Sequence, residues 1–212
     1  MQVNRPPPLD RLNSAVSGLS TARAALLDAA GAVQDGAQAL DATDAICAQG
    51  HGVPARTSQR NGAAAVTRAG DAVRNLPSLI ANYRASLTAL DKARTAVSGV
   101  ALTALGNVVR DGQAEATALA GFEAVVKTAW KQYVALEGQE RLWIKRAVTP
   151  WYRTAQEGAN AYAVLVGPYR RLLTVARTQV SEAATALRAP TSAQSATLAA
   201  ADRAMSALRT QG

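Results

Sequence analysis

The chain has 212 residues, of which 49 are alanine and nine are aromatic, with one cysteine and a formal net charge of +8. One cysteine excludes an internal disulfide and a cysteine-based zinc site, and no apolar run approaches the roughly 20 residues of a membrane span. The N-terminal sequence MQVNRPPPLD lacks the apolar core of a secretory signal. We therefore expect a soluble protein, cytoplasmic or part of an assembled particle, built from closely packed helices.

An extended arm is expected at residues 1–8, because three consecutive prolines favour polyproline II. From residue 9 an apolar repeat of seven residues predicts a helix over 9–47 in a left-handed coil. The repeat comprises Leu12, Leu19, Leu26, Val33, Leu40 and Cys47. It fits either a zipper to another subunit or one helix of an intramolecular bundle. We favour the bundle, because the later segments carry matching stripes.

A second stripe predicts a helix over 57–111, after a break at 48–56 that contains two glycines and a proline. Pro77 leaves two alternatives open: one kinked helix, or two helices with Asn75 capping the second. A turn is expected at 108–115.

A third stripe predicts a helix over 114–147, with a bend or short loop near 137–140 where Glu137 and Glu140 interrupt the apolar phase. Thr149 and Pro150 form a start signal for a fourth helix over 150–189. A short C-terminal helix is expected within 191–212.

The fold class that these segments predict is all-α. No stretch alternates with period two for long enough to form a strand. We expect an elongated antiparallel helical bundle or coiled coil over 9–190, with four long helical segments plus the short C-terminal helix.

Catalytic chemistry finds little support in the sequence. Cys47 and His51 are four residues apart, but Cys47 continues the leucine register and His51 lies in a glycine loop, so a core thiol and a solvated imidazole are expected. Glu137 and Glu140 favour a surface ion pair with Arg141 over an acid–base pair. The sequence has no phosphate loop, dinucleotide fingerprint or zinc spacing, so we expect no enzyme activity, cofactor or metal.

The one compositional anomaly is residues 127–177, with nine basic and three acidic residues, all three tryptophans and four of the five tyrosines. Trp130, Tyr133, Tyr162 and Tyr169 lie on apolar stripes and are expected in the core. Leu142 and Trp143 are the best candidates for exposed apolar groups.

The function expected from these patterns is structural or scaffolding, through self-association or membership of a larger protein assembly. The expected partner-binding residues are Arg141, Trp143, Lys145, Arg146, Trp151, Arg153, Arg170 and Arg171. The tryptophans would anchor a partner, and the cations would attract an acidic surface. The alternative is a peripheral binder of polyanions, either nucleic acid or an anionic membrane, through residues 127–177.

Overall fold

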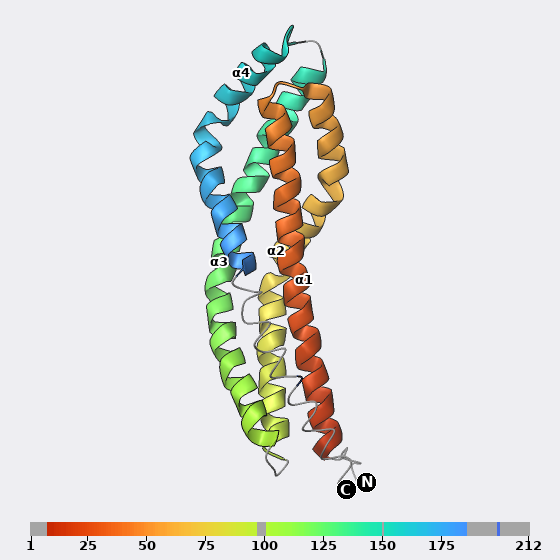
Figure 1. The fold of residues 1–212 in the computed structure, drawn as a ribbon, viewed down its shortest axis with the longest axis vertical. Coiled ribbons are helices and arrows are strands. Elements are labelled where there is room, and N and C mark those ends of the chain that lie inside the picture. The colour runs from red at the N-terminus through yellow and green to blue at the C-terminus, as the bar shows by residue number, and fades with distance from the viewer. Residues whose placement is uncertain (1–7, 97–100, 150, 186–198, 200–212) are drawn as a thin grey trace. The chain divides into compact units, whose positions relative to one another are not determined.

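The computed structural model describes residues 8–96, 101–149, 151–185 and 199 (Figure 1). The expected arm, apart from Pro8, lies outside these residues. So do the predicted end of the fourth helix and, apart from residue 199, the predicted C-terminal helix.

The described residues are almost entirely helical. They form α1 (Pro8–Ala48), α2 (Gly52–Arg94), α3 (Ala101–Val148) and α4 (Ala155–Val166), followed by the 3₁₀ turn η1 (Gly167–Tyr169) and a helical segment over 170–185. No strand occurs in the described ranges. The predicted all-α helical-bundle class is confirmed.

The chain divides into two compact units, and each of the three long helices contributes a segment to both. The first unit comprises Met1–Asp28, Leu76–Gly121 and Thr185–Gly212, and the second comprises Ala29–Asn75 and Phe122–Ala184. All contacts described below lie within one unit.

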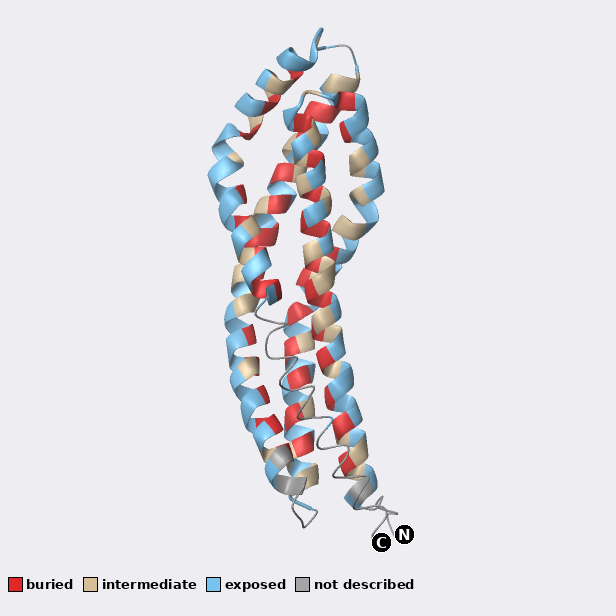
Figure 2. Cartoon of the chain, in the orientation of Figure 1, coloured by how far each residue is buried: buried red, intermediate tan, exposed pale blue. Residues whose placement is uncertain are grey.

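The apolar register of α1 is buried in both units, as predicted. In the first unit Leu12, Leu19 and Leu26 are at most 3% exposed, and in the second unit Val33, Leu40 and Cys47 are at most 6% exposed. The inward faces of the helices are correspondingly buried in Figure 2. Arg23 of α1 is also buried, and its Nε and Nη2 atoms have no hydrogen-bond partner among the residues that the structure describes.

The turn predicted at 108–115 is wrong, because these residues lie inside α3 and α2 ends at Arg94. Gly112 suggested a turn, yet its role is close packing. A Cβ on Gly112 would lie 2.5 Å from Leu87 Cδ2 and 3.1 Å from Tyr83 Oη. The Tyr83 hydroxyl in turn donates to Glu115 Oε2 at 2.6 Å, which joins α2 to α3 in the first unit.

The break between the first two helices is shorter than predicted, since α2 begins at Gly52 rather than residue 57. Pro54 is accommodated in the first helical turn, where its missing N–H would have no intrahelical acceptor. Gly50 makes the turn with a φ of +80°, a conformation that glycine adopts without steric cost.

Pro77 lies inside α2, which is one helix from Gly52 to Arg94. Of the two alternatives at this proline, the structure has the single helix. The boundary between the two units falls between Asn75 and Leu76, directly before this proline.

The short loop expected as one alternative near 137–140 is wrong, because α3 is helical without interruption from Ala101 to Val148. The buried stripe continues through Leu136, Glu140 and Trp143, which are 0%, 0% and 1% exposed. Glu140 therefore occupies a core position of an uninterrupted helix.

The fourth helix begins at Ala155, not at residue 150. The Thr149 hydroxyl donates to the carbonyl oxygens of Lys145 and Arg146, so this threonine belongs to the end of α3. Thr154 is the N-cap: its hydroxyl accepts from the Glu157 amide at 3.1 Å, and the Glu157 carboxylate accepts from the Arg153 amide at 2.8 Å. This pair resembles a capping box, with the carboxylate reaching one residue further back.

Candidate functional site

Trp143 is not the exposed anchor that the sequence predicted. It is 1% exposed, and its indole N–H donates to the Gly158 carbonyl at 3.0 Å. Its ring stacks on Tyr152 and meets Tyr162 edge to face, with centroid separations of 6.2 and 5.3 Å. Trp143 thus holds α4 against α3, and its position follows from the unbroken stripe of α3.

Trp151 is exposed, as required of a partner-binding side chain, with 72% of its surface accessible. The Arg146 guanidinium carbon lies 5.9 Å from the Trp151 ring centroid, a cation–π distance. Beside this pair, an open pocket of about 320 Å³ is lined by Trp143, Arg146, Tyr152, Ala161, Val164 and Leu165. We call Arg146, Trp151 and this pocket the α3–α4 corner.

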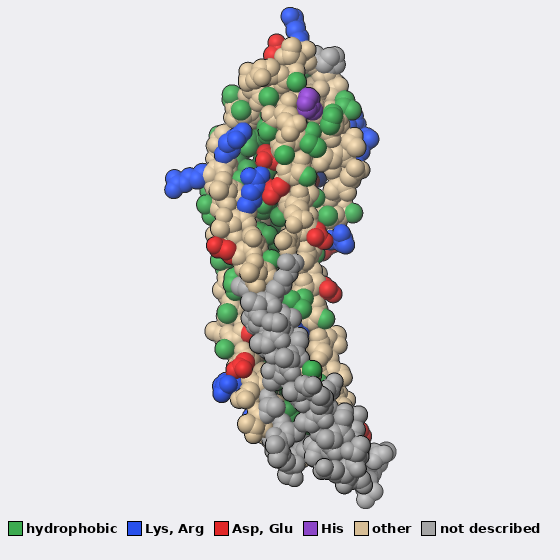
Figure 3. Space-filling model, viewed as in Figure 1, with side chains coloured by type: hydrophobic (Ala, Val, Ile, Leu, Met, Phe, Trp, Pro, Cys, Tyr) green, Lys and Arg blue, Asp and Glu red, His purple; other side chains and the backbone are tan. Residues whose placement is uncertain are grey.

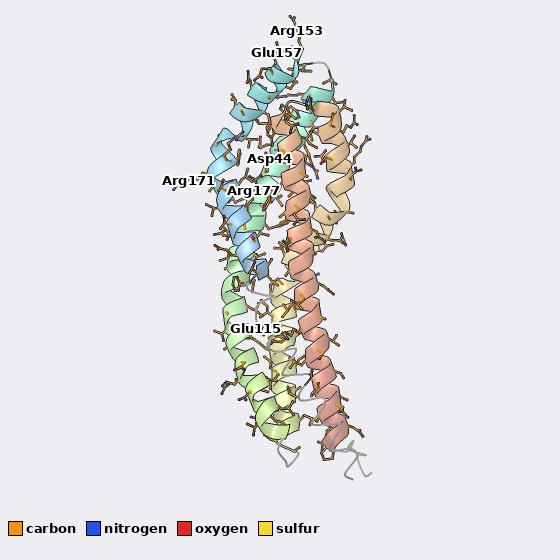
Figure 4. The ribbon with its side chains drawn as sticks, viewed as in Figure 1. Asp44, Glu115, Arg153, Glu157, Arg171 and Arg177 are labelled. Carbon is orange, nitrogen blue, oxygen red and sulfur yellow. The ribbon has the colours of Figure 1, made fainter. Side chains whose placement is uncertain are left out.

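The remaining predicted cations do not gather at one place. Arg141 and Lys145 line a different pocket with Arg56 of α2. Arg153 precedes the N-cap of α4, and Arg171 points away from the helices, as Figure 4 shows. Arg170 is exposed beside Arg171. The single surface expected from the sequence is therefore separated into several local sites.

The large apolar side chains that remain exposed are unevenly distributed. Among the described residues these are Val53, Val134, Leu142, Trp151, Val164, Leu172 and Val175. All seven belong to the second unit, and five of them lie within residues 142–175. Val164 at the α3–α4 corner is the most exposed, at 80%. Apolar and cationic side chains likewise intermingle on the face drawn in Figure 3.

A second candidate site lies inside the second unit and was missed by the sequence analysis. We call it the core polar cluster: Asp41, Asp44, Tyr133, Glu140, Tyr162 and Arg177. Arg177 joins the helical segment 170–185 to α1, with its Nε 2.6 Å from Asp41 Oδ1 and its Nη2 2.9 Å from Asp44 Oδ2. Figure 4 shows Arg177 directed toward Asp44.

The charges within the core polar cluster shift one another's ionisation. Burial alone lowers the pKa of Arg177, but its hydrogen bonds to Asp41 and Asp44 outweigh that effect and raise it. Burial raises the pKa of Asp41, against the opposing influence of Arg177. The guanidinium therefore remains charged between the two aspartates.

Glu140 is fully buried, and its ionisation is strongly shifted by its surroundings. Burial, followed by the nearby charge of Asp44, raises the pKa of Glu140 to about 8. Its Oε1 lies 3.3 Å from the Tyr162 hydroxyl, which is also 2.7 Å from Asp44 Oδ1. A hydroxyl has one hydrogen, so the shorter contact takes it. A protonated Glu140 then donates to the Tyr162 oxygen, completing a chain from Glu140 through Tyr162 to Asp44.

This geometry suits helix positioning better than catalysis. Glu140 and Cys47 are both 0% exposed, so neither offers an atom to a substrate. Asp41 and Arg177 border an open pocket of about 160 Å³, but they are paired with each other. Burial and the charges of Glu140 and Asp44 raise the pKa of the Cys47 thiol, which keeps it un-ionised. Thiolates, not thiols, are the nucleophiles.

Cys47 and His51 occupy the positions expected of structural residues: the thiol is in the core and the imidazole is exposed. Glu137 forms the expected ion pair with Arg141, at 2.6 Å. Within the described ranges, no group of three or more histidine, cysteine, aspartate or glutamate residues is arranged to hold a metal ion.

One signal could have identified part of the core polar cluster. Asp44 and Glu140 both fall on apolar stripes in the sequence, where a charged residue requires a buried partner. Arg177 gives no such signal, because it lies next to the core residue Ala176 and not at a core position itself. Its pairing depends on which helices are neighbours.

Comparisons with protein-family models, with curated proteins and with solved structures gave no match to this chain. None of the helices described is both long enough and apolar enough to span a membrane. Function must therefore be argued from the sites themselves.

Proposed function

We propose that this chain is a non-enzymatic structural component of a larger protein assembly, and that it binds its partner through the α3–α4 corner. The observation that supports this most directly is the cation–π pair of Arg146 and Trp151 at the rim of an apolar pocket. Tryptophan and arginine are the residues most enriched at energetic hot spots of protein interfaces. The pocket is large enough for an apolar side chain of a partner.

The exposure of these groups is costly unless a partner covers them. A tryptophan side chain buries roughly 150–250 Å² when it is enclosed, yet Trp151 is 72% exposed and Val164 is 80% exposed. Contiguous exposed apolar surface on a protein is typical of interaction sites. Leu172 and Val175, in the helical segment 170–185, are also exposed.

Charge argues that the partner is a different, acidic surface. Residues 127–177 carry nine basic and three acidic side chains. Of these acids, Glu140 is buried, Glu137 pairs with Arg141, and Glu157 caps the backbone before α4. Two copies of this basic surface would repel each other. A different partner that presents a carboxylate beside an apolar side chain would place the carboxylate against Arg146 and the apolar side chain in the pocket.

The test is site-specific photo-crosslinking in the cell of origin, with a photoreactive phenylalanine analogue replacing Val164. We expect a crosslink to a different protein, and we expect Arg146→Glu to reduce it by about tenfold, because the charge reversal opposes an acidic partner. Arg60→Glu is the matched control, since Arg60 is exposed on α2 and lines neither corner nor pocket.

Three outcomes would contradict the proposal: no crosslink, a crosslink to another copy of this chain, or equal crosslinking in the Arg146→Glu variant. Light scattering of the purified chain at low and high salt measures self-association separately. The alternative function, polyanion binding through residues 127–177, requires retention on nucleic acid or anionic vesicles that weakens steeply with added salt. A partner contact made through Trp151 and the neighbouring apolar pocket is expected to resist salt.

A further inference from the structure

A second pocket in the second unit has a lining that the partner-binding proposal does not use. It is open, has a volume of about 280 Å³, and lies between the beginning of α2 and the end of α3. Arg56 comes from α2, and Arg141 and Lys145 come from α3. Ile144 and Val148 supply the apolar part of the lining, and Gln59 and Thr149 complete it.

The lining brings three positive charges together without an acid among them. Arg141 places its Nη2 2.6 Å from Glu137 Oε1, outside the lining. Arg56 and Lys145 take part in no ion pair with any residue that the structure describes. Like charges around one hollow repel, and an anion between them would convert that repulsion into attraction.

The helix dipole favours the position of Lys145 but not that of Arg56. Lys145 lies in the last turn of α3, where a cation offsets the negative end of the helix dipole. Arg56 lies near the start of α2, where the dipole disfavours a cation, and the first turn of α2 contains no acid. The position of Arg56 is thus unfavourable without a negative group nearby.

An independent observation concerns Gln59. Its Nε2 atom is buried and has no hydrogen-bond partner among the residues that the structure describes. A buried donor left unpaired costs free energy, and a bound ligand or an ordered water is one way to satisfy it. Guanidinium, ammonium and amide nitrogens are all donors. The pocket therefore presents donors and positive charge, and it complements a group that only accepts.

We propose that this pocket binds a phosphate monoester. The phosphoryl group lies among Arg56, Arg141 and Lys145, and the organic part lies against Ile144 and Val148. An arginine guanidinium can donate two parallel hydrogen bonds to two oxygens of one phosphate. Three cationic side chains also balance the charge of a phosphate dianion better than that of a carboxylate, which has a single negative charge. The phosphoryl group belongs either to a soluble metabolite or to a lipid headgroup, and both sources present the same chemistry to the pocket.

The chain contains a built-in reporter for this site, because it has only three isoleucines: Ile46, Ile80 and Ile144. Ile144 lines the pocket, whereas Ile80 lies buried in the first unit. With isoleucine methyl groups labelled, titration of the full chain with phenyl phosphate is expected to shift the Ile144 resonance in NMR spectra. The Ile80 resonance is expected to stay in place and to report that the fold is unchanged.

The variants Arg56→Gln and Lys145→Gln are each expected to weaken phenyl phosphate binding roughly tenfold, the loss of one charge-assisted hydrogen bond. Arg60→Gln, elsewhere on α2, is the matched control and is expected to bind normally. The proposal is overturned by no shift at Ile144, by an equal shift from sodium chloride at the same ionic strength, or by equal affinity in all three variants.

Phosphatidylcholine vesicles with and without phosphatidic acid distinguish the two sources. Binding to the vesicles that contain phosphatidic acid, lost in Arg56→Gln, assigns the lipid headgroup. Binding of phenyl phosphate without binding to these vesicles assigns the soluble source. None of these variants alters Trp151, Arg146 or Val164. If phosphate binding is not found, the partner-binding proposal is therefore unaffected and is tested by the crosslinking experiment alone.

Discussion

The carboxyl group of Glu140 lies 3.3 Å from the hydroxyl oxygen of Tyr162, whose single hydrogen is directed to Asp44 at 2.7 Å. Glu140 is 0% exposed, and its Oε2 has no hydrogen-bond partner among the residues that the structure describes. An ionised glutamate in this position would compete with Asp44 for the single Tyr162 hydrogen while shielded from solvent. The protonated form instead donates to Tyr162, so this proton is part of the folded structure.

The first prediction concerns the pH dependence of stability. The pKa of Glu140 is raised to about 8, so the folded protein binds this proton more tightly than the unfolded chain does. The contribution of Glu140 to the free energy of unfolding is therefore fully present below its unfolded pKa of about 4.3 and is lost as pH rises through about 8. The expected loss is at most about 1.4 kcal/mol per pH unit within this window.

Urea unfolding monitored by tryptophan fluorescence measures this effect, because all three tryptophans belong to the second unit. Glu140→Gln keeps a neutral donor beside Tyr162 and is expected to flatten the pH dependence. Glu182→Gln, at an exposed glutamate of the second unit, is the control and is expected to retain it. An equally steep loss of stability in the Glu140→Gln variant would rule out this residue as the source.

The thiol of Cys47 gives a second prediction. It is 0% exposed, and burial together with the charges of Glu140 and Asp44 raises its pKa. Reaction with a thiol-specific disulfide reagent at neutral pH is therefore expected to require opening of the second unit. We expect labelling at least about a hundredfold slower than in the urea-unfolded chain, because only the open state exposes the thiol. Similar rates in the two states would contradict the burial of Cys47.

The helical class and the core of this protein follow from its seven-residue apolar repeat, whereas the polar contacts do not. The register places Leu12 through Cys47 in the core without any knowledge of neighbours. The apolar stripe of α3 includes Glu140, but periodicity does not show that Tyr162 lies opposite it. From sequence alone the glutamate therefore indicates the end of the stripe, and Trp143, three residues later, is expected on the surface.

The predicted turns failed for a related reason. Glycine and proline mark both turns and close helix contacts, and only the packed structure separates the two roles. Gly112 allows α2 and α3 to approach in the first unit, and Gly50 does form a turn. The start of α4 was misplaced because Thr149 and Pro150 match a helix start, while the working cap is Thr154 with Glu157.

A third prediction uses two glycines of α1 in the second unit, Gly36 and Gly31. A Cβ on Gly36 would collide with Ala69 Cβ, and it would lie 2.9 Å from the Trp130 ring and 3.1 Å from the Ala65 carbonyl oxygen. Gly36→Ala is therefore expected to destabilise the second unit by about 1–3 kcal/mol, the usual range for overpacking. No heavy atom lies within 4 Å of a Cβ on Gly31.

Gly31→Ala is the matched control for this experiment. It adds the same methyl group to the same helix, and it is expected to stabilise the protein by up to about 1 kcal/mol through helix propensity alone. Urea midpoints of the two variants and the parent chain give the comparison. If both substitutions were stabilising, the close approach of α1 and α2 at Gly36 would be disproved.

The last prediction separates the two tryptophans that the sequence analysis treated alike. Trp143→Phe removes the indole N–H that donates to the buried Gly158 carbonyl at 3.0 Å, so it leaves that oxygen unpaired. We expect a loss of about 1–3 kcal/mol in the free energy of unfolding, the cost of an unsatisfied buried acceptor. Trp151→Phe changes a side chain that is 72% exposed and is expected to leave stability within about 0.5 kcal/mol of the parent chain. Chemical denaturation followed by circular dichroism measures both variants without depending on the altered fluorophore. A large loss for Trp151→Phe, or none for Trp143→Phe, would reverse the roles assigned here, whereas the expected result leaves Trp151 free to bind a partner without a role in folding.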